Sequence, residues 1–340
     1  MADAGLGTGK LPPDLLRRVV LGRLGARRPE TLVRAALGVD AAALAFGDWA
    51  CVLTVDPITT AGGGAGHLAV VVACNDLAAM GAEPLGVLPT LLFPAGVSVA
   101  TVADLAGQID AAARALNVEV LGGHTEIAPG LAAPLVVMTA VGRARPERLL
   151  TAAGARPGDA LVLTKAAALE GTSILAHDLA DRLAGQVPEA LLAEARGYRA
   201  ELSVVPEGLA AAALGATAMH DPTEGGILGA LWELAEASGA GCRVDVAAIP
   251  VREPTRAICA ALGVDPLRLI ASGALLIACP DGPRLVRDLA ARGLAATVIG
   301  AVTAGGRELV RPDGTATPIG PVERDELYRV LETLQSDGDR

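Results

Sequence analysis

The sequence has little of what builds a nucleic-acid surface. Its 340 residues include two lysines, Lys10 and Lys165, and aromatic residues make up 2% of the chain. The formal net charge is −10, and no run of Lys or Arg occurs. Nucleic-acid binding needs clustered positive charge, and binding of single strands also uses aromatic side chains on which bases stack. The composition therefore predicts no nucleic-acid partner.

Apolar segments of membrane-spanning length are also missing, although 52% of the residues are hydrophobic. A transmembrane helix needs about 20 consecutive apolar residues, and charged residues interrupt every apolar run before that length. The run from Leu68 to Ala79 is too short and contains Asn75 and Asp76. No positively charged n-region followed by an apolar h-region opens the chain, so no signal peptide is predicted. We expect a cytoplasmic protein that does not enter the membrane.

Paired cysteines and the common nucleotide-binding motifs are absent as well. None of the five cysteines forms a C-x-x-C pair, and most lie in apolar runs, which indicates buried thiols rather than disulfides or a zinc site. The sequence contains no Walker A pattern, no Rossmann G-x-G-x-x-G and no kinase signature. A nucleotide site would therefore be built from other residues.

The length predicts two domains, because 340 residues exceed what one ordinary core uses. Pro and Gly cluster between Arg143 and Gly158, and this cluster marks the expected boundary. The second half is typical of an α+β domain. The expected division is a flexible N-terminus at 1–9, a first domain at 10–150, a second domain at 151–330 and a polar tail at 331–340.

The first half contains several regular patterns. Residues 41–46 and 50–55 predict two strands joined by a hairpin turn. Residues 67–80 are apolar nearly all round and predict a buried helix, whereas 98–116 predict an amphipathic helix. Residues 118–121 predict a buried strand, which stops at two glycines.

Three aspartates lie at or within these elements. Asp40 precedes the first strand of the hairpin, Asp56 follows the second, and Asp76 lies inside the buried helix. A buried carboxylate without a partner is costly and shifts its pKa instead. Asp76 is therefore paired, caps an element, or binds a metal, and we favour metal binding or the lining of a site.

A polar turn follows the strand at 118–121. Gly122 and Gly123 let the backbone turn sharply, and His124 and Glu126 then place an imidazole and a carboxylate just past a strand end. Alone, this segment is typical of a solvated loop. A similar arrangement in the second half, Met219-His-Asp-Pro-Thr-Glu-Gly-Gly226, favours a site instead.

Three further charged residues, Asp221, Glu224 and Lys10, have structural interpretations. Asp221 and Glu224 would line a site, cap the helix that begins near Gly226, or do both, because Asp-x-x-Glu before a helix is a capping pattern. Lys10 is interpreted as a solvated N-terminal charge.

Together these residues predict a metal–phosphate site. Carboxylates on rigid strand ends are the oxygen ligands that Mg²⁺ prefers, and Mg²⁺ is usually shared with the phosphates of a nucleotide. Thr59, the glycine run at 62–64 and the helix start at Gly225 and Gly226 would supply backbone N–H groups to phosphate.

The order of seven short motifs resembles the aminoimidazole-ribonucleotide synthetase superfamily, the PurM-like proteins. Within it, the chain is most similar to the hydrogenase-maturation protein HypE and its relatives, from about Lys10 to about Gly300. The motifs are Gly38-Val-Asp-Ala-Ala42, Val55-Asp-Pro-Ile-Thr59, Asn75-Asp76, Met80-Gly-Ala-Glu-Pro84, Gly122-Gly-His-Thr-Glu126, Thr164-Lys165 and His220-Asp-Pro-Thr-Glu-Gly-Gly226.

The resemblance implies a two-domain α/β (α+β) fold in which the N-terminal strands of two copies form a shared β-barrel. It implies a homodimer that binds ATP and Mg²⁺ in a cleft near the interface. It also implies a second substrate, either a small molecule or a protein-bound group, which the sequence does not identify. It places the N-terminal segment around Lys10 near ATP.

The resemblance also assigns roles to residues. Asp40, Asp56 and Asp76 would hold Mg²⁺ and the ATP phosphates. The residues expected to be catalytic are His124, Glu126 and Lys165. The remaining residues expected to bind the nucleotide are Thr59, Asn75, Gly122, Gly123, Asp221 and Glu224.

Two features depart from the family pattern. Relatives often carry an acidic residue just before the Asp-Ala-Ala motif, where this chain has Val39. HypE itself ends in a cysteine that carries a carbamoyl group, which ATP-dependent dehydration turns into a thiocyanate. The present chain ends Leu334-Gln-Ser-Asp-Gly-Asp-Arg340, and its last cysteine is Cys279. We therefore expect the nucleotide machinery without the terminal-cysteine chemistry.

Three functions are consistent with these residues, and we favour the first. It is an ATP-dependent enzyme that phosphorylates an amide or carbonyl oxygen, in which His124 or Glu126 moves a proton and Lys165 neutralises charge on phosphate. The second is a nucleotide-binding partner in hydrogenase maturation without turnover, which the missing terminal cysteine favours. The third is a small-molecule kinase like thiamine-monophosphate kinase, which His124 disfavours because that motif normally has aspartate there.

Overall fold

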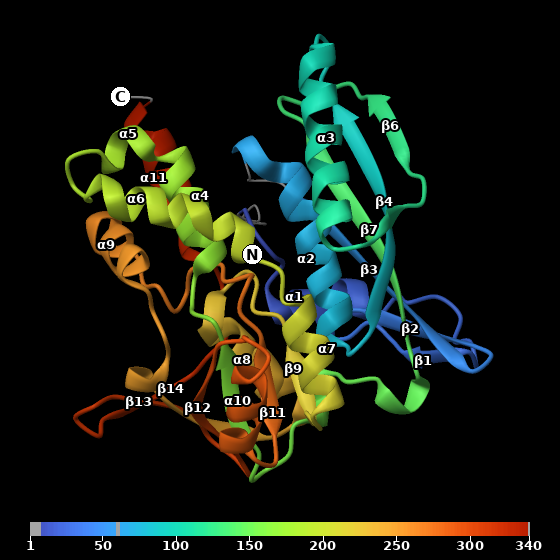
Figure 1. The fold of residues 1–340 in the computed structure, drawn as a ribbon, viewed down its shortest axis with the longest axis vertical. Coiled ribbons are helices and arrows are strands. Elements are labelled where there is room, and N and C mark those ends of the chain that lie inside the picture. Colours follow the sequence, from blue (N-terminus) through green and yellow to red (C-terminus); the bar gives the residue numbers. More distant parts are fainter. Residues whose placement is uncertain (1–7, 59–61, 339–340) are drawn as a thin grey trace, which may run out of the picture.

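Two seven-stranded sheets divide the chain into a first and a second domain (Figure 1). The computed structural model describes residues 8–58 and 62–338. The first sheet uses strands between Thr31 and Ala144, and the second uses strands between Ala160 and Pro318. The predicted two-domain α/β architecture is therefore confirmed. No helix in the described ranges is long and apolar enough to cross a membrane.

The first sheet is mostly antiparallel and contains the predicted hairpin. Its strand order is β1 (Thr31–Val33), β2 (Ala42–Phe46), β3 (Trp49–Ile58), β7 (Leu135–Ala144), β4 (Glu83–Phe93) and β5 (Glu119–Val120), and β6 (His124–Ile127) also pairs with β4. β2 and β3 are joined through Gly47, whose φ of +60° suits a tight turn. Their register places Ala43 opposite Val52, and both side chains are fully buried.

The buried helix predicted at 67–80 is α2 (Ala65–Ala79). It packs on β3, β7 and α3 (Val99–Ala115), and it also contacts α7 (Val205–Ala213) of the second domain. Gly208 permits that contact, since a Cβ there would lie 2.5 Å from the Ala78 carbonyl oxygen. Because the sheet and the second domain enclose α2, its sequence is apolar nearly all round.

The two faces of the first sheet differ. Helices α2 and α3 lie on one face (Figure 1), where Val52 and Met138 are fully buried against them. Residues that alternate with these point the other way. Among them, Leu53 and Val141 are half-buried, and Val55 is 60% exposed. This face of the sheet is therefore less completely covered within the described residues than the face that carries α2 and α3.

The segment 118–127 differs from the sequence prediction. β5 contains only Glu119 and Val120, both exposed, and residues 124–127 form the edge strand β6 rather than a loop. β6 runs parallel to β4. Gly123 has a φ of +139°, and a Cβ there would lie 2.2 Å from the Pro89 carbonyl oxygen. The apolar pattern predicted a buried strand wrongly, because this strand lies at the sheet edge.

The second sheet is covered on both faces. Its order is β14 (Ala316–Pro318), β13 (Arg307–Val310), β10 (Gly241–Asp245), β12 (Ala296–Thr303), β8 (Ala160–Thr164), β11 (Leu276–Cys279) and β9 (Ala218–His220). Leu161 and Leu163 share an apolar cluster with α8 (Gly226–Ser238). Val162, which points the other way, shares one with α7 and α10 (Gly282–Ala290).

A separate group of helices completes the second domain. The helices α4 (Leu169–Asp178), α6 (Glu189–Gly197), α9 (Glu253–Leu262) and α11 (Glu326–Gly338) share one apolar cluster. The short helices are α1 (Pro13–Leu16) and α5 (Ala180–Leu183). The chain passes from β8 to α4 through two left-handed residues, Lys165 and Ala168. This turn places Glu170 in the first turn of α4.

Candidate functional site

The three aspartates predicted as metal ligands meet around one threonine. Asp40 precedes β2, Thr54 and Asp56 lie on β3, and Asp76 lies on α2. Thr54 Oγ1 donates a hydrogen bond to Asp76 Oδ2 at 2.6 Å. The same oxygen lies 3.4 Å from Asp56 Oδ2 and 3.2 Å from the Asp40 backbone oxygen. Residues from two strand ends and a buried helix thus converge at one end of the first sheet.

The environment of these carboxylates disfavours their negative charge. Burial, followed by repulsion from Asp56 and Asp40, raises the pKa of Asp76 well above its ordinary value. Burial also raises the pKa of Asp56. Asp40 Oδ2 is buried and has no hydrogen-bond partner among the described residues. Such a cluster either shares protons or requires a cation.

A divalent cation fits this cluster only as an ion shared with a ligand. The described residues contain no group of three or more His, Cys, Asp and Glu side chains arranged to hold a metal. Mg²⁺ usually takes one or two protein carboxylates and completes its shell with water and phosphate oxygens. Asp40, Asp56 and Asp76 therefore fit Mg²⁺ that arrives with a nucleotide, rather than a closed protein site.

A histidine from the second domain bridges two of the acidic groups. His220 lies at the end of β9, and its Nδ1 is 2.6 Å from Asp40 Oδ1. Its Nε2 is 2.7 Å from Glu233 Oε2 on α8. Burial would lower the pKa of His220, but Asp40 and Glu233 outweigh burial and raise it well above its ordinary value. His220 is therefore an imidazolium that links the two domains.

The sequence interpretation missed both halves of this bridge. His220 lies inside a motif that was singled out, but Asp221 and Glu224 were chosen from it. Glu233 is a carboxylate in a helix that is otherwise mostly buried. That position, a charge on an apolar helix, was the available signal.

A cavity of about 400 Å³ opens between these groups. Asp40, Asp56 and Asp76 line it from the first domain. Glu170, which the sequence interpretation also missed as a site residue, lines it from the second domain. Further lining residues of the second domain are His220, Thr223, Glu224, Glu233, Ile270 and Ser272. The cleft is thus mainly acidic and lies between the domains.

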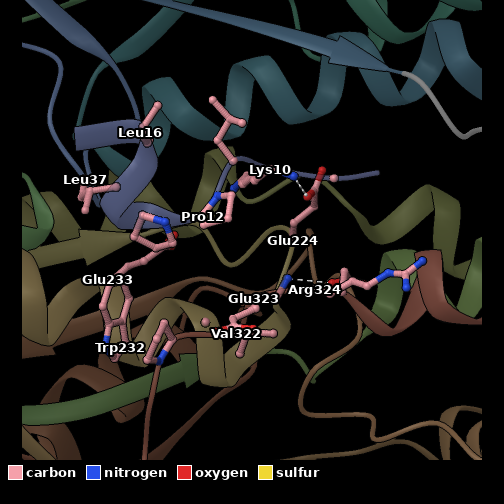
Figure 2. Close-up of a pocket in the computed structure, with 17 residues that line it drawn as sticks. Lys10, Pro12, Leu16, Leu37, Glu224, Trp232, Glu233, Val322, Glu323 and Arg324 are labelled. Carbon is pink, nitrogen blue, oxygen red and sulfur yellow. Dashed lines mark hydrogen bonds between the residues drawn. The ribbon is translucent and has the colours of Figure 1, made fainter. Parts of the chain in front are cut away.

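Lys10 brings a positive charge into this cleft from the N-terminal segment. Its Nζ donates a hydrogen bond to Thr223 Oγ1 at 2.8 Å. Its backbone N donates one to Glu224 Oε2 at 3.0 Å, which Figure 2 shows. Burial would lower the pKa of Lys10, but the carboxylates of Glu233, Glu224 and Asp76 outweigh it and raise the pKa. Lys10 is therefore held by the second domain.

A second, more apolar cavity of about 220 Å³ lies beside the first. Pro12 and Leu16 of the N-terminal segment face Trp232 of α8 across it (Figure 2). Lys10 and Glu224 line both cavities. The N-terminal segment therefore forms a wall between a polar and an apolar space.

Other predicted residues lie away from the cleft within this chain. His124 and Glu126 are on β6, with side chains 65% and 55% exposed, and His124 Nε2 is 3.1 Å from Glu126 Oε2. Gly122 and Gly123 lead into that strand. None of these four residues lines either cavity.

Lys165 also lies outside both cavities. Its Nζ is 2.7 Å from Glu207 Oε1 and donates hydrogen bonds to the carbonyl oxygens of Ser203, at 2.6 Å, and Gly273, at 3.2 Å. These contacts are all within the second domain. In this structure Lys165 therefore links two backbone segments of the second domain through their carbonyl oxygens.

Asn75 connects the domains rather than lining the cleft. Its Nδ2 donates a hydrogen bond to the Leu202 carbonyl oxygen at 2.8 Å, and its Oδ1 accepts one from Val204 N at 2.8 Å. Both amide atoms are thus bonded to the second domain. This explains why a buried apolar helix contains an asparagine.

The remaining predicted residues surround the start of α8. Asp221 is 1% exposed, and neither of its carboxylate oxygens has a partner among the described residues. Gly225 is the N-cap of α8 without a side-chain cap, and its N–H instead donates to Asp325 Oδ2 at 2.7 Å. The alternative that Asp221 or Glu224 caps α8 is therefore wrong. Thr59 lies outside the described residues.

Comparisons with known proteins agree with this geometry. Residues 38–144 match the family described as AIR synthase related protein, N-terminal domain, and residues 156–311 match its C-terminal domain. Carbamoyl dehydratase HypE of Azotobacter vinelandii is 33% identical over 282 residues, covering 78% of this chain and 76% of that protein. Carbamoyl dehydratase HypE of Rhodobacter capsulatus is 31% identical over 309 residues, covering 88% and 87%.

A solved structure of a hydrogenase maturation protein HypE in complex with ATP has the same fold. Its TM-score is 0.70 at 23% identity, over 92% of this chain and 94% of that one. Two matching domain families, relatives above 30% identity and the shared fold lead to one conclusion. This chain belongs to the AIR synthase-related, PurM-like superfamily, as a HypE-like member.

Proposed function

We propose that this protein binds Mg·ATP in the interdomain cleft and transfers the γ-phosphoryl group to an amide or carbonyl oxygen of a second substrate. The observation that carries the proposal is the convergence of Asp40, Asp56 and Asp76 in a cleft that both domains line. The similarity to carbamoyl dehydratases and to an ATP-bound HypE supports it.

Phosphoryl transfer would turn the substrate oxygen into a leaving group. The bond between the γ-phosphorus and the β,γ-bridging oxygen breaks, a bond from that phosphorus to the substrate oxygen forms, and ADP leaves. The phosphorylated oxygen is then a good leaving group. An amide that loses it as phosphate together with two N–H protons becomes a nitrile, and attack by an internal nucleophile instead closes a ring.

The chain's own residues position the reactants. Asp40, Asp56 and Asp76 would hold Mg²⁺ against the phosphates, and Mg²⁺ would neutralise the phosphate charge. His220 fixes the orientation of Asp40 through the bond between Nδ1 and Oδ1. Lys10 lies at the same cleft and is free to exchange Thr223 for a phosphate oxygen, because its ammonium group has three donors.

We further propose a homodimer that pairs through the helix-free face of the first sheet. That face is apolar and partly exposed, as at Val55 and Val141. β6 is an edge strand paired with β4 of the same sheet, with His124 and Glu126 exposed on it. A dimer is the arrangement that would bring these two side chains to a nucleotide, since they line neither cavity of their own chain.

A second candidate function is nucleotide binding without turnover. The observation in its favour is Lys165, because the cation expected to neutralise phosphate is bonded to Glu207 and two carbonyl oxygens. Two measurements distinguish these functions. Calorimetry with a non-hydrolysable ATP analogue reports binding, and a phosphate-release assay with Mg·ATP reports turnover. Binding with no release, with and without candidate amides, supports the second function and overturns the first.

A further inference from the structure

Glu170 is a buried carboxylate on the second-domain side of the cleft, and no cation of the described residues contacts it. It is 4% exposed, lies in the first turn of α4 and lines the larger cavity. Its Oε2 has no hydrogen-bond partner among the described residues. Most buried polar atoms in proteins are paired, so an unpaired carboxylate oxygen on a side chain that lines a cavity requires an explanation.

The surroundings of Glu170 add negative charge. Burial raises the pKa of Glu170 to about 7, the Ser272 side chain opposes that effect, and the carboxylates of Asp325 and Glu224 reinforce it. Asp221, whose two oxygens also lack partners, lies within electrostatic range of Glu170. This wall of the cleft is therefore lined by carboxyl groups whose ionisation a bound cation would favour.

The two basic side chains of the cleft contact residues other than Glu170. Among the described residues that line this cavity, Lys10 and His220 are the basic ones. Lys10 Nζ donates to Thr223, and His220 is held between Asp40 and Glu233. The aspartates of the first domain would bind Mg²⁺, and Mg²⁺ would bind the ATP phosphates. A positive group that neutralises Glu170 would therefore come from a ligand.

We infer that the second-domain wall of the cleft binds a basic nitrogen group of the second substrate, an amine, amidine or guanidine that donates N–H bonds to Glu170. This inference rests on the proposed function, since it names the substrate class of the same cleft. The substrate would carry an amide or carbonyl oxygen at one end and the basic group at the other.

An organic cation fits this wall better than a second metal ion. Planar amidinium and guanidinium groups pair well with one carboxylate through two parallel N–H bonds.

The test measures binding of small probes by calorimetry. Acetamidinium, methylguanidinium and ethylammonium chloride are compared with acetamide and sodium acetate, with and without Mg²⁺ and a non-hydrolysable ATP analogue. We expect at least one of the cations to bind and the neutral and anionic probes not to bind. Glu170→Gln, which keeps the size of the side chain, should weaken that binding at least tenfold. Asp110→Asn, which changes an exposed carboxylate on α3, should not.

A second readout separates pairing with Glu170 from a merely structural effect. Near pH 7, a bound cation should displace the proton that Glu170 partly holds, so the binding heat should depend on the ionisation enthalpy of the buffer. That dependence should disappear in Glu170→Gln. Circular dichroism checks that the variant is folded.

The outcomes distinguish this inference from the proposed function. Glu170-dependent cation binding without ATP binding would overturn the proposed function and support the inference. ATP turnover with no cation binding, or with equal binding in Glu170→Gln, would overturn the inference alone. A Glu170-dependent signal from MgCl₂ alone would also overturn it, since the wall would then hold a metal.

Discussion

His220 Nδ1 lies 2.6 Å from Asp40 Oδ1, and this contact joins the second domain to the first at the proposed active site. The other ring nitrogen, Nε2, lies 2.7 Å from Glu233 Oε2. One imidazolium thus neutralises two carboxylates. It also fixes Asp40 so that its second oxygen, Oδ2, has no hydrogen-bond partner in the part of the chain that the structure describes. The geometry of the proposed metal ligand therefore depends on a residue 180 positions away.

Replacing His220 should destabilise the fold. His220→Gln leaves the carboxylates of Asp40 and Glu233 without their cation, and breaking one side of a buried ion pair costs about 3–5 kcal/mol. We expect a loss of about 3 kcal/mol in the free energy of unfolding, measured by urea denaturation. His124→Gln is the matched control, because its exposed pair with Glu126 contributes less than about 1 kcal/mol. Similar losses in both variants would contradict the bridge.

The contribution of His220 should depend on pH. Its folded-state pKa lies well above the ordinary 6.5. The stabilisation is therefore fully present below pH 6.5 and is lost as pH rises through the folded-state pKa. The stability difference between wild type and His220→Gln should shrink from pH 6 towards strongly alkaline pH. A difference that grows with pH would show that the histidine is neutral in the folded protein.

Ionisation of Glu170 should destabilise the fold, whereas the charge on His220 stabilises it. Its pKa rises from 4.5 to about 7 on folding, so the folded state binds the proton more tightly, and stability falls as pH rises from about 4.5 to 7. Glu170→Gln removes this penalty. At pH 8 the variant should be more stable by on the order of 3 kcal/mol, and at pH 4 the two proteins should be similar. Thermal or urea unfolding at both pH values measures this, and a less stable variant at pH 8 would show that Glu170 is already neutralised.

The prediction from sequence was best where local pattern decides the structure. The hairpin around Gly47 and the all-round apolar pattern of α2 both follow from periodicity, and they bring Asp56 and Asp76 together. Asp40 joins them because it lies two residues before β2, the neighbouring strand. Three carboxylates spread over 37 positions could therefore be grouped before the structure was known.

The rest of the site depends on contacts between the domains, which periodicity does not encode. His220 meets Asp40 across 180 positions, and Lys10 meets Thr223 across 213. Lys165 was expected to face phosphate, but no local pattern indicates that Glu207 lies beside it. Glu170 follows an apolar stretch and carries no motif, so only its burial and its Oε2, which is unpaired among the described residues, identify it.

Asp56 should be needed for Mg·ATP. Asp56→Asn removes one charge from the proposed ligand set and should lower the affinity for Mg·ATP, or the rate of phosphate release, by on the order of 10- to 100-fold. Because the neutral side chain relieves repulsion with Asp76, the fold should not be weakened. The loss should be partly recovered at high Mg²⁺ concentration. Asp110→Asn serves as the control, and wild-type behaviour of Asp56→Asn would remove this residue from the assignment.

A charge on the helix-free face of the first sheet should prevent dimerisation. Val141 lies on β7 and points away from α2, on the same face as Leu53, with which it pairs. Val141→Lys would place an ammonium group in an apolar interface, whereas in a monomer the side chain reaches solvent. Analytical ultracentrifugation should find a dimer for the wild type and a monomer for the variant. Val99→Lys is the control, because Val99 is an 85% exposed apolar residue on α3, a helix on the opposite face. A monomeric wild type, or a dimeric Val141→Lys, would exclude this interface and leave His124 and Glu126 without a route to a nucleotide.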